Sequence, residues 1–207
     1  MDGFLTVGVF ASMPVEHGFG LKSSVLPPDL AGLRQIHSDR ILVAQETGNC
    51  GDGDALITGR PELAVSIRTA DCYPILLADA RTGAVAAVHS GWRGTAARIV
   101  LRTLERMNHE FGTEPGDIRA AIGPGIGACC YEVGRDVALQ FGIDGGRAHL
   151  DLAQENRRQM ERAGIRPQNI EALGICTFCD AERFFSYRRE KEKAGRMTSF
   201  IRIVRPR

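Results

Sequence analysis

Residues 84–111 read AVAAVHSGWRGTAARIVLRTLERMNHEF and contain a strand pattern, a glycine-rich turn and a helix pattern in direct succession. Residues 84–89 form a short run of small and β-branched apolar side chains, which is typical of a strand. Residues 95–111 place apolar side chains three and four positions apart, the spacing of one helix face. These side chains are Ala97, Val100, Leu101, Leu104, Met107 and Phe111. A strand followed at once by an amphipathic helix predicts a mixed α/β fold.

Further apolar runs, bounded by turn or charged residues, extend this pattern along the chain. They predict strands at 65–67, 75–77, 118–122, 170–175 and 199–204, and helices at 134–141 and 152–163. Because the strand patterns are almost continuously apolar, we expect strands covered on both faces. A chain of 207 residues fits one domain with a substantial core. The expected architecture is α/β (mixed α+β), a single compact domain over residues 1–207, with a mixed central sheet flanked by helices.

Composition and charge narrow the classes of partner. Apolar residues make up 43% of the chain and charged residues 25%, which is typical of a folded domain. The formal net charge is only +1, so no strong overall field attracts nucleic acid or an anionic membrane, and we expect neither partner. No signal peptide or run of 18 apolar residues is found, which predicts a cytoplasmic protein. The oligomeric state is not indicated.

The cysteines favour free thiols over a disulfide framework. The chain has six cysteines, but a chain of this length without a signal peptide differs from a small secreted scaffold. Cys176 and Cys179 have the spacing of a redox or zinc motif, yet no second such pair completes four ligands. Cys129 and Cys130 are adjacent and would point apart in an extended chain. We therefore expect these four to be core thiols.

A thiol and an imidazole lie at the ends of two predicted strands, where they can come close together. Cys72 lies between two predicted strands, and His89 ends the next strand, just before a glycine-rich turn. His37 lies between a predicted helical turn and the apolar run at 41–44, and could supply a third group. One thiolate and two imidazoles suit zinc, filling three tetrahedral positions and leaving a fourth open, as in catalytic sites. Spacing alone leaves buried structural Cys and His as the alternative.

A set of motifs in fixed order adds to this interpretation. They are QIHSDR (35–40), GDALIT (53–58), TADCYPILLAD (69–79), VHSGWRG (88–94), IGPGIGACCYEV (122–133), CTFCDAERFFSYRR (176–189) and GRMTSFIRI (195–203). From about residue 35 onward the chain resembles the purine nucleoside phosphorylase family that carries the label "laccase domain" or "polyphenol oxidase". The resemblance implies that His37, Cys72 and His89 are zinc ligands. It also implies phosphorolysis of adenosine, inosine, guanosine and methylthioadenosine, together with adenosine deamination, so purine nucleosides and inorganic phosphate are the expected partners.

Other side chains are candidates for the same site. Arg93 lies on a glycine-flanked turn before the predicted helix, where backbone N–H groups and a guanidinium can bind phosphate. Arg188 of the Ser-Tyr-Arg-Arg element and Gln35 are further candidate substrate contacts, each with a surface or structural role as the alternative. Asp71 could orient a metal-bound water or a histidine, or could be a turn residue. The expected catalytic set is Cys72, His89 and Asp71.

Three alternative functions stay open, and a multicopper laccase is not one of them. A multicopper laccase needs paired histidines, and the five histidines here contain no His-x-His pair. A copper-binding polyphenol oxidoreductase remains an alternative, because copper binds such ligands strongly. A metal-free thiol hydrolase or deamidase would use Cys72 as nucleophile and His89 as base, and the deamidase domain of cytotoxic necrotizing factors resembles the chain remotely. The third alternative is a binding module without turnover.

Overall fold

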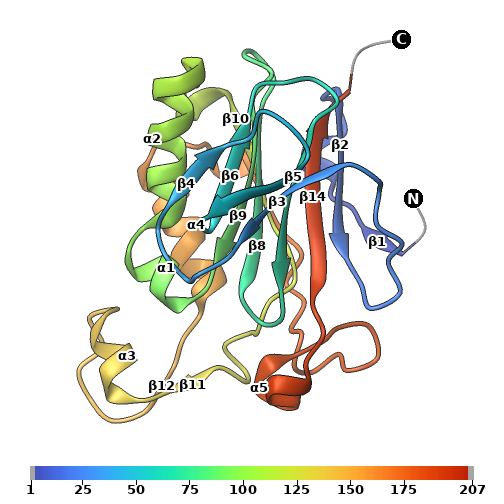
Figure 1. The fold of residues 1–207 in the computed structure, drawn as a ribbon. Coiled ribbons are helices and arrows are strands. Elements are labelled where there is room, and N and C mark those ends of the chain that lie inside the picture. The colour runs from blue at the N-terminus through green and yellow to red at the C-terminus, as the bar shows by residue number, and fades with distance from the viewer. Residues whose placement is uncertain (1–2, 205–207) are drawn as a thin grey trace.

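The computed structural model describes residues 3–204 as a mixed α/β domain built on two sheets (Figure 1). The first six-stranded sheet of this described region has the order β1 (Phe4–Leu5), β2 (Val15–Gly20), β14 (Met197–Ile203), β7 (Ala64–Thr69), β3 (Leu30–Arg34) and β5 (Gly48–Asp52). The second has the order β13 (Ile170–Ala172), β10 (Ile118–Ile122), β8 (Tyr73–Asp79), β9 (Val85–Ser90), β6 (Ala55–Thr58) and β4 (Ile41–Val43). Both contain parallel and antiparallel pairs. The predicted class in one compact domain is confirmed, and its strands divide between two packed sheets.

The second sheet is covered on both faces, as its continuous apolar runs predicted. Alternate residues of a strand point to opposite faces. In β8, Ile75 and Leu77 therefore pack under the helices, whereas Leu76 and Ala78 pack against the first sheet. All four are fully buried. The result is a three-layer arrangement with this sheet in the middle.

Helices cover the outer face of the second sheet (Figure 1). They are α1 (Trp92–Ala96), α2 (Ile99–Phe111) and α4 (Leu152–Arg162), while α3 (Arg135–Leu139) and α5 (Tyr187–Glu190) lie toward the end where β8 begins. Short 3-10 turns are η1 (Gly8–Phe10), η2 (Pro115–Asp117), η3 (Pro167–Asn169) and η4 (Lys191–Lys193), and β11 (Glu132–Val133) pairs with β12 (Ala148–His149). No helix in the described region is long and apolar enough to cross a membrane.

The helix predicted over 95–111 is two helices. Arg98 adopts a left-handed conformation with φ of 60°, which ends α1 and starts α2 in a new direction. After this break the predicted buried face is that of α2, where Ile99, Val100, Leu104 and Met107 all pack on the sheet. Periodicity therefore identified the buried face correctly but could not detect the break.

Other differences lie at the N-terminal side and near residue 173. The helical turn predicted before His37 is wrong, because β3 ends there at Arg34. The strand predicted over 170–175 ends at Ala172. The short strands β1, β2, β3 and β5 were not predicted, because Gly and polar residues interrupt their apolar pattern. They are four of the six strands of the first sheet.

Candidate metal and active site

His37, Cys72 and His89 meet at one end of the second sheet. In the β8–β9 pair, Tyr73 lies opposite Ser90 and Pro74 opposite His89, so Cys72 and His89 share the same sheet end. His37 follows β3 and has φ of 58°. The imidazole rings of His37 and His89 are 5.1 Å apart between centroids. One ligand atom from each of the three residues lies within 4.8 Å of the others.

Asp54 holds two of these elements in place. It precedes β6, which pairs with β9, and its carbonyl oxygen accepts the N–H of His89 at 2.7 Å. Its carboxylate lies 2.8 Å from Nδ1 of His89 and accepts the backbone N–H of His37 at 3.1 Å. The same carboxylate accepts the N–H and hydroxyl of Ser38 at 2.6 and 2.7 Å. Asp54 is fully buried, so it links the His37 loop to the sheet from inside the protein.

Cys72, His89 and the neighbouring Asp54 have strongly shifted pKa values. Burial alone would raise the pKa of Cys72, but the charge of His89 and hydrogen bonds from both histidines lower it to about 6. Burial alone would lower the pKa of His89, yet the Cys72 thiolate and Asp54 raise it to about 9. Asp54, despite its burial, has a pKa of about 2 because His89 and Ser38 donate to it. A thiolate at neutral pH follows.

The donor set fits a divalent metal ion such as zinc. A thiolate and two imidazoles are ligands of catalytic zinc sites. The Asp54 carboxylate engages Nδ1 of His89, which leaves Nε2 as the ligand nitrogen, as carboxylates commonly do behind metal-bound histidines. Gly91 keeps the approach to the sulfur open, because a Cβ there would stand 2.7 Å from Cys72 Sγ. Clustered donors with a supporting carboxylate distinguish this group from scattered core residues.

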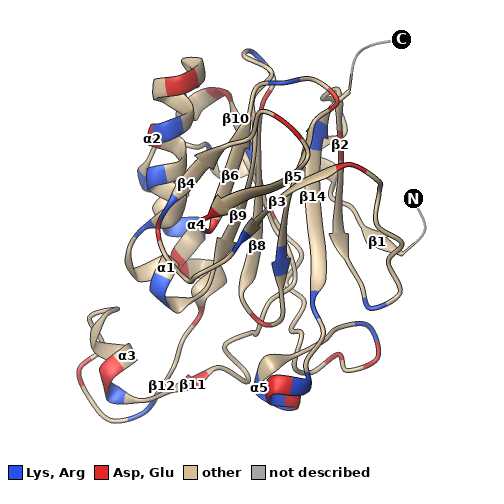
Figure 2. Cartoon of the chain, in the orientation of Figure 1, with Lys and Arg blue, Asp and Glu red and all other residues tan. Residues whose placement is uncertain are grey.

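The cluster lies in the wall of a cavity of about 810 Å³, a volume in the usual range of small-molecule sites. Among the described residues that line it, six carry a basic side chain and one carries a carboxylate, Asp71. The basic residues are Arg34, Arg68, Arg93, Arg188, Lys191 and Arg196. Figure 2 shows Lys and Arg near this end of the strands and on α5. Although the whole chain is nearly neutral, this cavity is cationic and suits an anionic ligand.

Arg93 lines the cavity from the first turn of α1, whereas the sequence placed it on a turn before the helix. Its side chain is exposed, and its guanidinium lies 4.5 Å from the centroid of the Trp92 ring. Trp92 both lines the cavity and packs against the core. α1 has only five residues, so anion binding at this turn would depend on the Arg93 side chain rather than on the helix N-terminus.

Asp71 anchors the segment that carries Arg188. Its carboxylate accepts hydrogen bonds from the Thr177 hydroxyl at 2.7 Å, the Ser186 hydroxyl at 3.1 Å and the Arg188 N–H at 2.6 Å. Asp71 has φ of 84°, a conformation uncommon for a residue with a side chain. Asp71, which was expected to orient a histidine or a metal-bound water, therefore binds the Thr177–Arg188 segment instead. The carboxylate next to His89 is that of Asp54.

Arg188 and Gln35 line the same cavity, and their side chains also form hydrogen bonds with the protein backbone. Arg188 donates from Nη1 to the carbonyl oxygen of Glu132 at 3.0 Å, and its guanidinium lies 5.2 Å from the Tyr131 ring centroid. Gln35 makes two hydrogen bonds of 2.8 Å with the backbone of Arg68. Its amide thus fixes β7 against the His37 loop at the cavity rim.

Sequence reasoning missed two features. The first is Asp54, which lies in the GDALIT motif. Its position directly before a buried apolar strand could have indicated a buried functional carboxylate. The prediction that Cys129, Cys130, Cys176 and Cys179 are core thiols is wrong, because two of them are exposed and two are only half-buried. Their sulfur atoms lie within 4.8 Å of one another. Two segments about fifty positions apart meet there, which spacing cannot show.

The fold and this site define a mixed α/β protein with a candidate metal-dependent active site in a cationic cavity. A sequence profile of the family described as multi-copper polyphenol oxidoreductase laccase matches residues 21–204. The chain therefore belongs to that family. Its predicted resemblance is confirmed.

Relatives agree with this assignment. The chain is 44% identical to a purine nucleoside phosphorylase of Deinococcus radiodurans over 86% of this chain and 71% of that protein. It is 36% identical to adenosine deaminase RL5 of an unknown prokaryotic organism, over 94% and 80% of the two chains. The crystal structure of YfiH from Bacillus licheniformis matches with a TM-score of 0.89 and 28% identity, covering 98% and 97%. These names support the prediction of an enzyme of this kind.

Proposed function

We propose that this chain is a zinc-dependent purine nucleoside phosphorylase for adenosine, inosine, guanosine and methylthioadenosine, which also deaminates adenosine in the same site. The observation that carries the proposal is the cluster of His37, Cys72 and His89 in the wall of a cationic cavity. Relatives named purine nucleoside phosphorylase and adenosine deaminase support the two activities.

The proposed reaction matches the charge of the cavity. In phosphorolysis a phosphate oxygen forms a bond to the ribose C1′, the bond from C1′ to the purine nitrogen breaks, and its electron pair goes to the base. The site must therefore bind an anion and stabilise charge that develops on the purine. Arg93, with its planar fork of donors, is the candidate phosphate ligand. Arg188 adds a second positive charge to the same wall.

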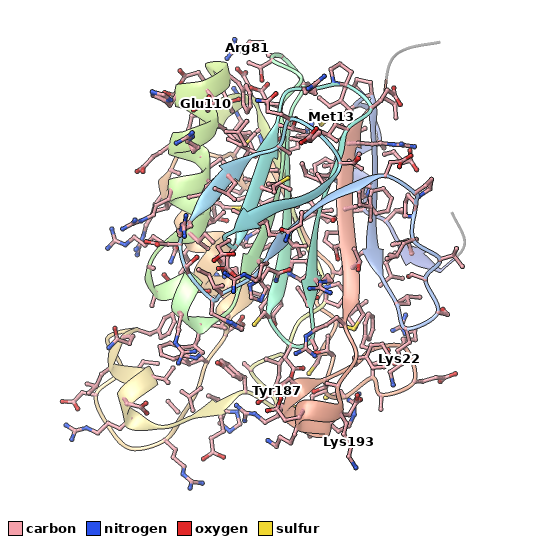
Figure 3. The ribbon with its side chains drawn as sticks, in the orientation of Figure 1. Met13, Lys22, Arg81, Glu110, Tyr187 and Lys193 are labelled. Carbon is pink, nitrogen blue, oxygen red and sulfur yellow. The ribbon has the colours of Figure 1, made fainter. Side chains whose placement is uncertain are left out.

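The remaining residues would hold the metal and the base. His37, Cys72 and His89 would bind zinc, which supplies a Lewis acid when bound. Trp92, Tyr131 and Tyr187 offer aromatic surface on the cavity wall, against which a purine can stack. Tyr187, labelled in Figure 3, lies at the end of α5 that faces the strand ends. Copper would suit the same donors, so the metal found in protein purified from cells decides between the two.

A metal-free thiol enzyme is the second candidate, because Asp54, His89 and Cys72 form a chain like a catalytic triad. Asp54 lies 2.8 Å from Nδ1 of His89. The pKa of Cys72 is lowered to about 6, which makes the thiol a ready nucleophile. Such an enzyme has no need of His37. A His37→Ala variant therefore separates the candidates, because only the metal enzyme should lose activity with it.

The test measures metal content and phosphate dependence together. Protein purified without added metal should lose one equivalent of zinc on Cys72→Ala, and its turnover of adenosine or inosine should vanish. Free base and ribose 1-phosphate, followed by chromatography, should appear only when phosphate is present. Cys50→Ala is the matched control, since Cys50 lies on β5 and does not line the cavity. Base release at an equal rate without phosphate would show that the protein is a hydrolase. Wild-type rates in Cys72→Ala would show that the active site has been assigned to the wrong residues.

A further inference from the structure

Four cysteines form a second cluster beside the active-site cavity. Cys129 and Cys130 follow the 123–127 glycine loop, and Cys176 and Cys179 occupy a turn after β13. Sγ of Cys179 lies 3.4 Å from Sγ of Cys130 and 3.8 Å from Sγ of Cys129, and all four sulfurs lie within 4.8 Å of one another. In Figure 3, sulfur atoms gather near the strand ends next to α5.

We propose that these four cysteines bind a structural metal ion, with zinc as the metal. Thiolates about 2.3 Å from a tetrahedral zinc lie about 3.8 Å from one another, so the cluster already has nearly the spacing of a Cys₄ site. An iron–sulfur cage, also held by four cysteines, would require its sulfurs to stand farther apart. The compact spacing thus favours a single ion.

Backbone groups are arranged as they are around bound thiolates. The N–H of Gly127 donates to Sγ of Cys176 at 3.2 Å, and the N–H of Asp180 donates to the carbonyl oxygen of Cys176 at 3.1 Å, closing the turn. At Gly127 a Cβ would stand 3.3 Å from Sγ of Cys129, so glycine leaves the room that the cluster needs.

A disulfide would explain less of this arrangement. One bond, for example between Cys130 and Cys179, would leave two thiols in contact with it, and Cys129 is exposed to solvent. A single ion engages all four sulfurs at once. None of the four belongs to the described residues that line the cavity. Four protein ligands would leave no open position on the ion, which is the pattern of a structural site.

The ion would tie together two loops that build the cavity wall. Gly125 forms a parallel bridge with Cys176, and Thr177 donates its N–H to the carbonyl oxygen of Gly125 at 3.0 Å. The first loop carries Ile126 and Tyr131 to the cavity. The second carries Thr177, which donates to Asp71. Through these contacts the cluster would hold Ile126 and Tyr131 in the cavity wall.

Metal analysis of matched variants tests the proposal. The Cys176→Ser/Cys179→Ser double variant should contain one equivalent of zinc less than wild type, and Cys72→Ala should keep this equivalent. Cys50→Ser is the control for the loss of a thiol and should match wild type. If the active site binds no zinc, the double variant still loses one equivalent, so the two proposals fail separately. An unchanged metal content in the folded double variant would overturn the Cys₄ site.

A spectroscopic measurement on Cys72→Ala covers the case in which the double variant fails to fold. Cobalt(II) added to metal-depleted, reduced Cys72→Ala should give intense sulfur-to-cobalt charge-transfer bands and the visible bands of a tetrahedral thiolate site. Added zinc should abolish these bands. Absence of the bands, or a thiol count in denatured, chelator-treated protein that shows two cysteines lost to a disulfide, would overturn the proposal.

Discussion

The carboxylate of Asp54 bridges two candidate metal ligands, with one oxygen 2.8 Å from Nδ1 of His89 and 3.1 Å from the backbone nitrogen of His37. His89 lies on the central strand β9, and His37 lies on the loop that follows β3 of the other sheet. A single buried side chain therefore sets both the orientation of one imidazole and the position of the other. Its removal should affect the metal before it affects the fold.

Asp54→Asn should weaken zinc binding by about 10–100-fold, since carboxylates behind metal-bound histidines contribute that much to affinity. The amide would also direct N–H groups toward the N–H donors of the His37 loop. Competition with a chelator of known affinity measures the change. Ser38→Ala is the control, because it removes one hydroxyl from Asp54 but leaves the contact with His89. Wild-type affinity in Asp54→Asn would contradict this role.

Gly91→Ala should reduce metal affinity and turnover by about tenfold or more, because moving a ligand by a fraction of an ångström spoils the coordination geometry. The new Cβ would stand 2.7 Å from Sγ of Cys72. Gly91 has φ of −85°, which alanine tolerates, so the effect isolates the contact with the sulfur. Metal content and circular dichroism are measured on the same samples. Gly116→Ala, where nothing lies within 4 Å, should behave as wild type.

Arg93→Lys should lower kcat/KM for phosphate on the order of tenfold, even though the charge is kept. A hydrogen bond to a charged group contributes about 1.5–3 kcal/mol, and Lys cannot form the planar two-point contact. Initial rates at varied phosphate concentration and saturating inosine measure the effect. Arg106→Lys, on the exposed face of α2, is the matched control. Equal phosphate kinetics in Arg93→Lys and wild type would place phosphate elsewhere.

His17→Gln should reduce the acid sensitivity of the fold. Burial lowers the pKa of His17 below 6.5, although Glu171 acts in the opposite direction, and its Nε2 accepts the N–H of Val7 at 3.0 Å. The unfolded chain therefore takes up a proton as the pH falls through 6.5 while the folded chain stays neutral, so stability decreases below that pH. Gln keeps an acceptor and does not titrate.

Urea unfolding at about pH 7.5 and about pH 5.5 measures this difference. Wild type should lose more free energy of unfolding between the two conditions than His17→Gln does. His109→Gln is the control, because His109 is an exposed histidine on α2 and should keep the wild-type dependence. Equal pH dependence in wild type and His17→Gln would show that His17 contributes nothing.

The sequence alone determined four strands of the central sheet, which are β8, β9, β10 and β13, and the helices α2 and α4 that cover it. Ile75, Leu76 and Leu77 are all apolar because a strand between two layers buries both of its faces, and this rule is local. The candidate ligands His37, Cys72 and His89 were also identified from motifs, and the structure brings them together. These features follow from residue type and short-range spacing.

Only the tertiary structure decided how these parts combine. Arg98 breaks the predicted helix through a left-handed backbone conformation that the apolar spacing does not reveal. Asp54 became the partner of His89 because β6 pairs beside β9, and Cys129 met Cys179 because two loops cross at the sheet end. Both contacts join residues 35 or more positions apart. Strand pairing and layer packing create such contacts, and no local pattern of residues encodes them.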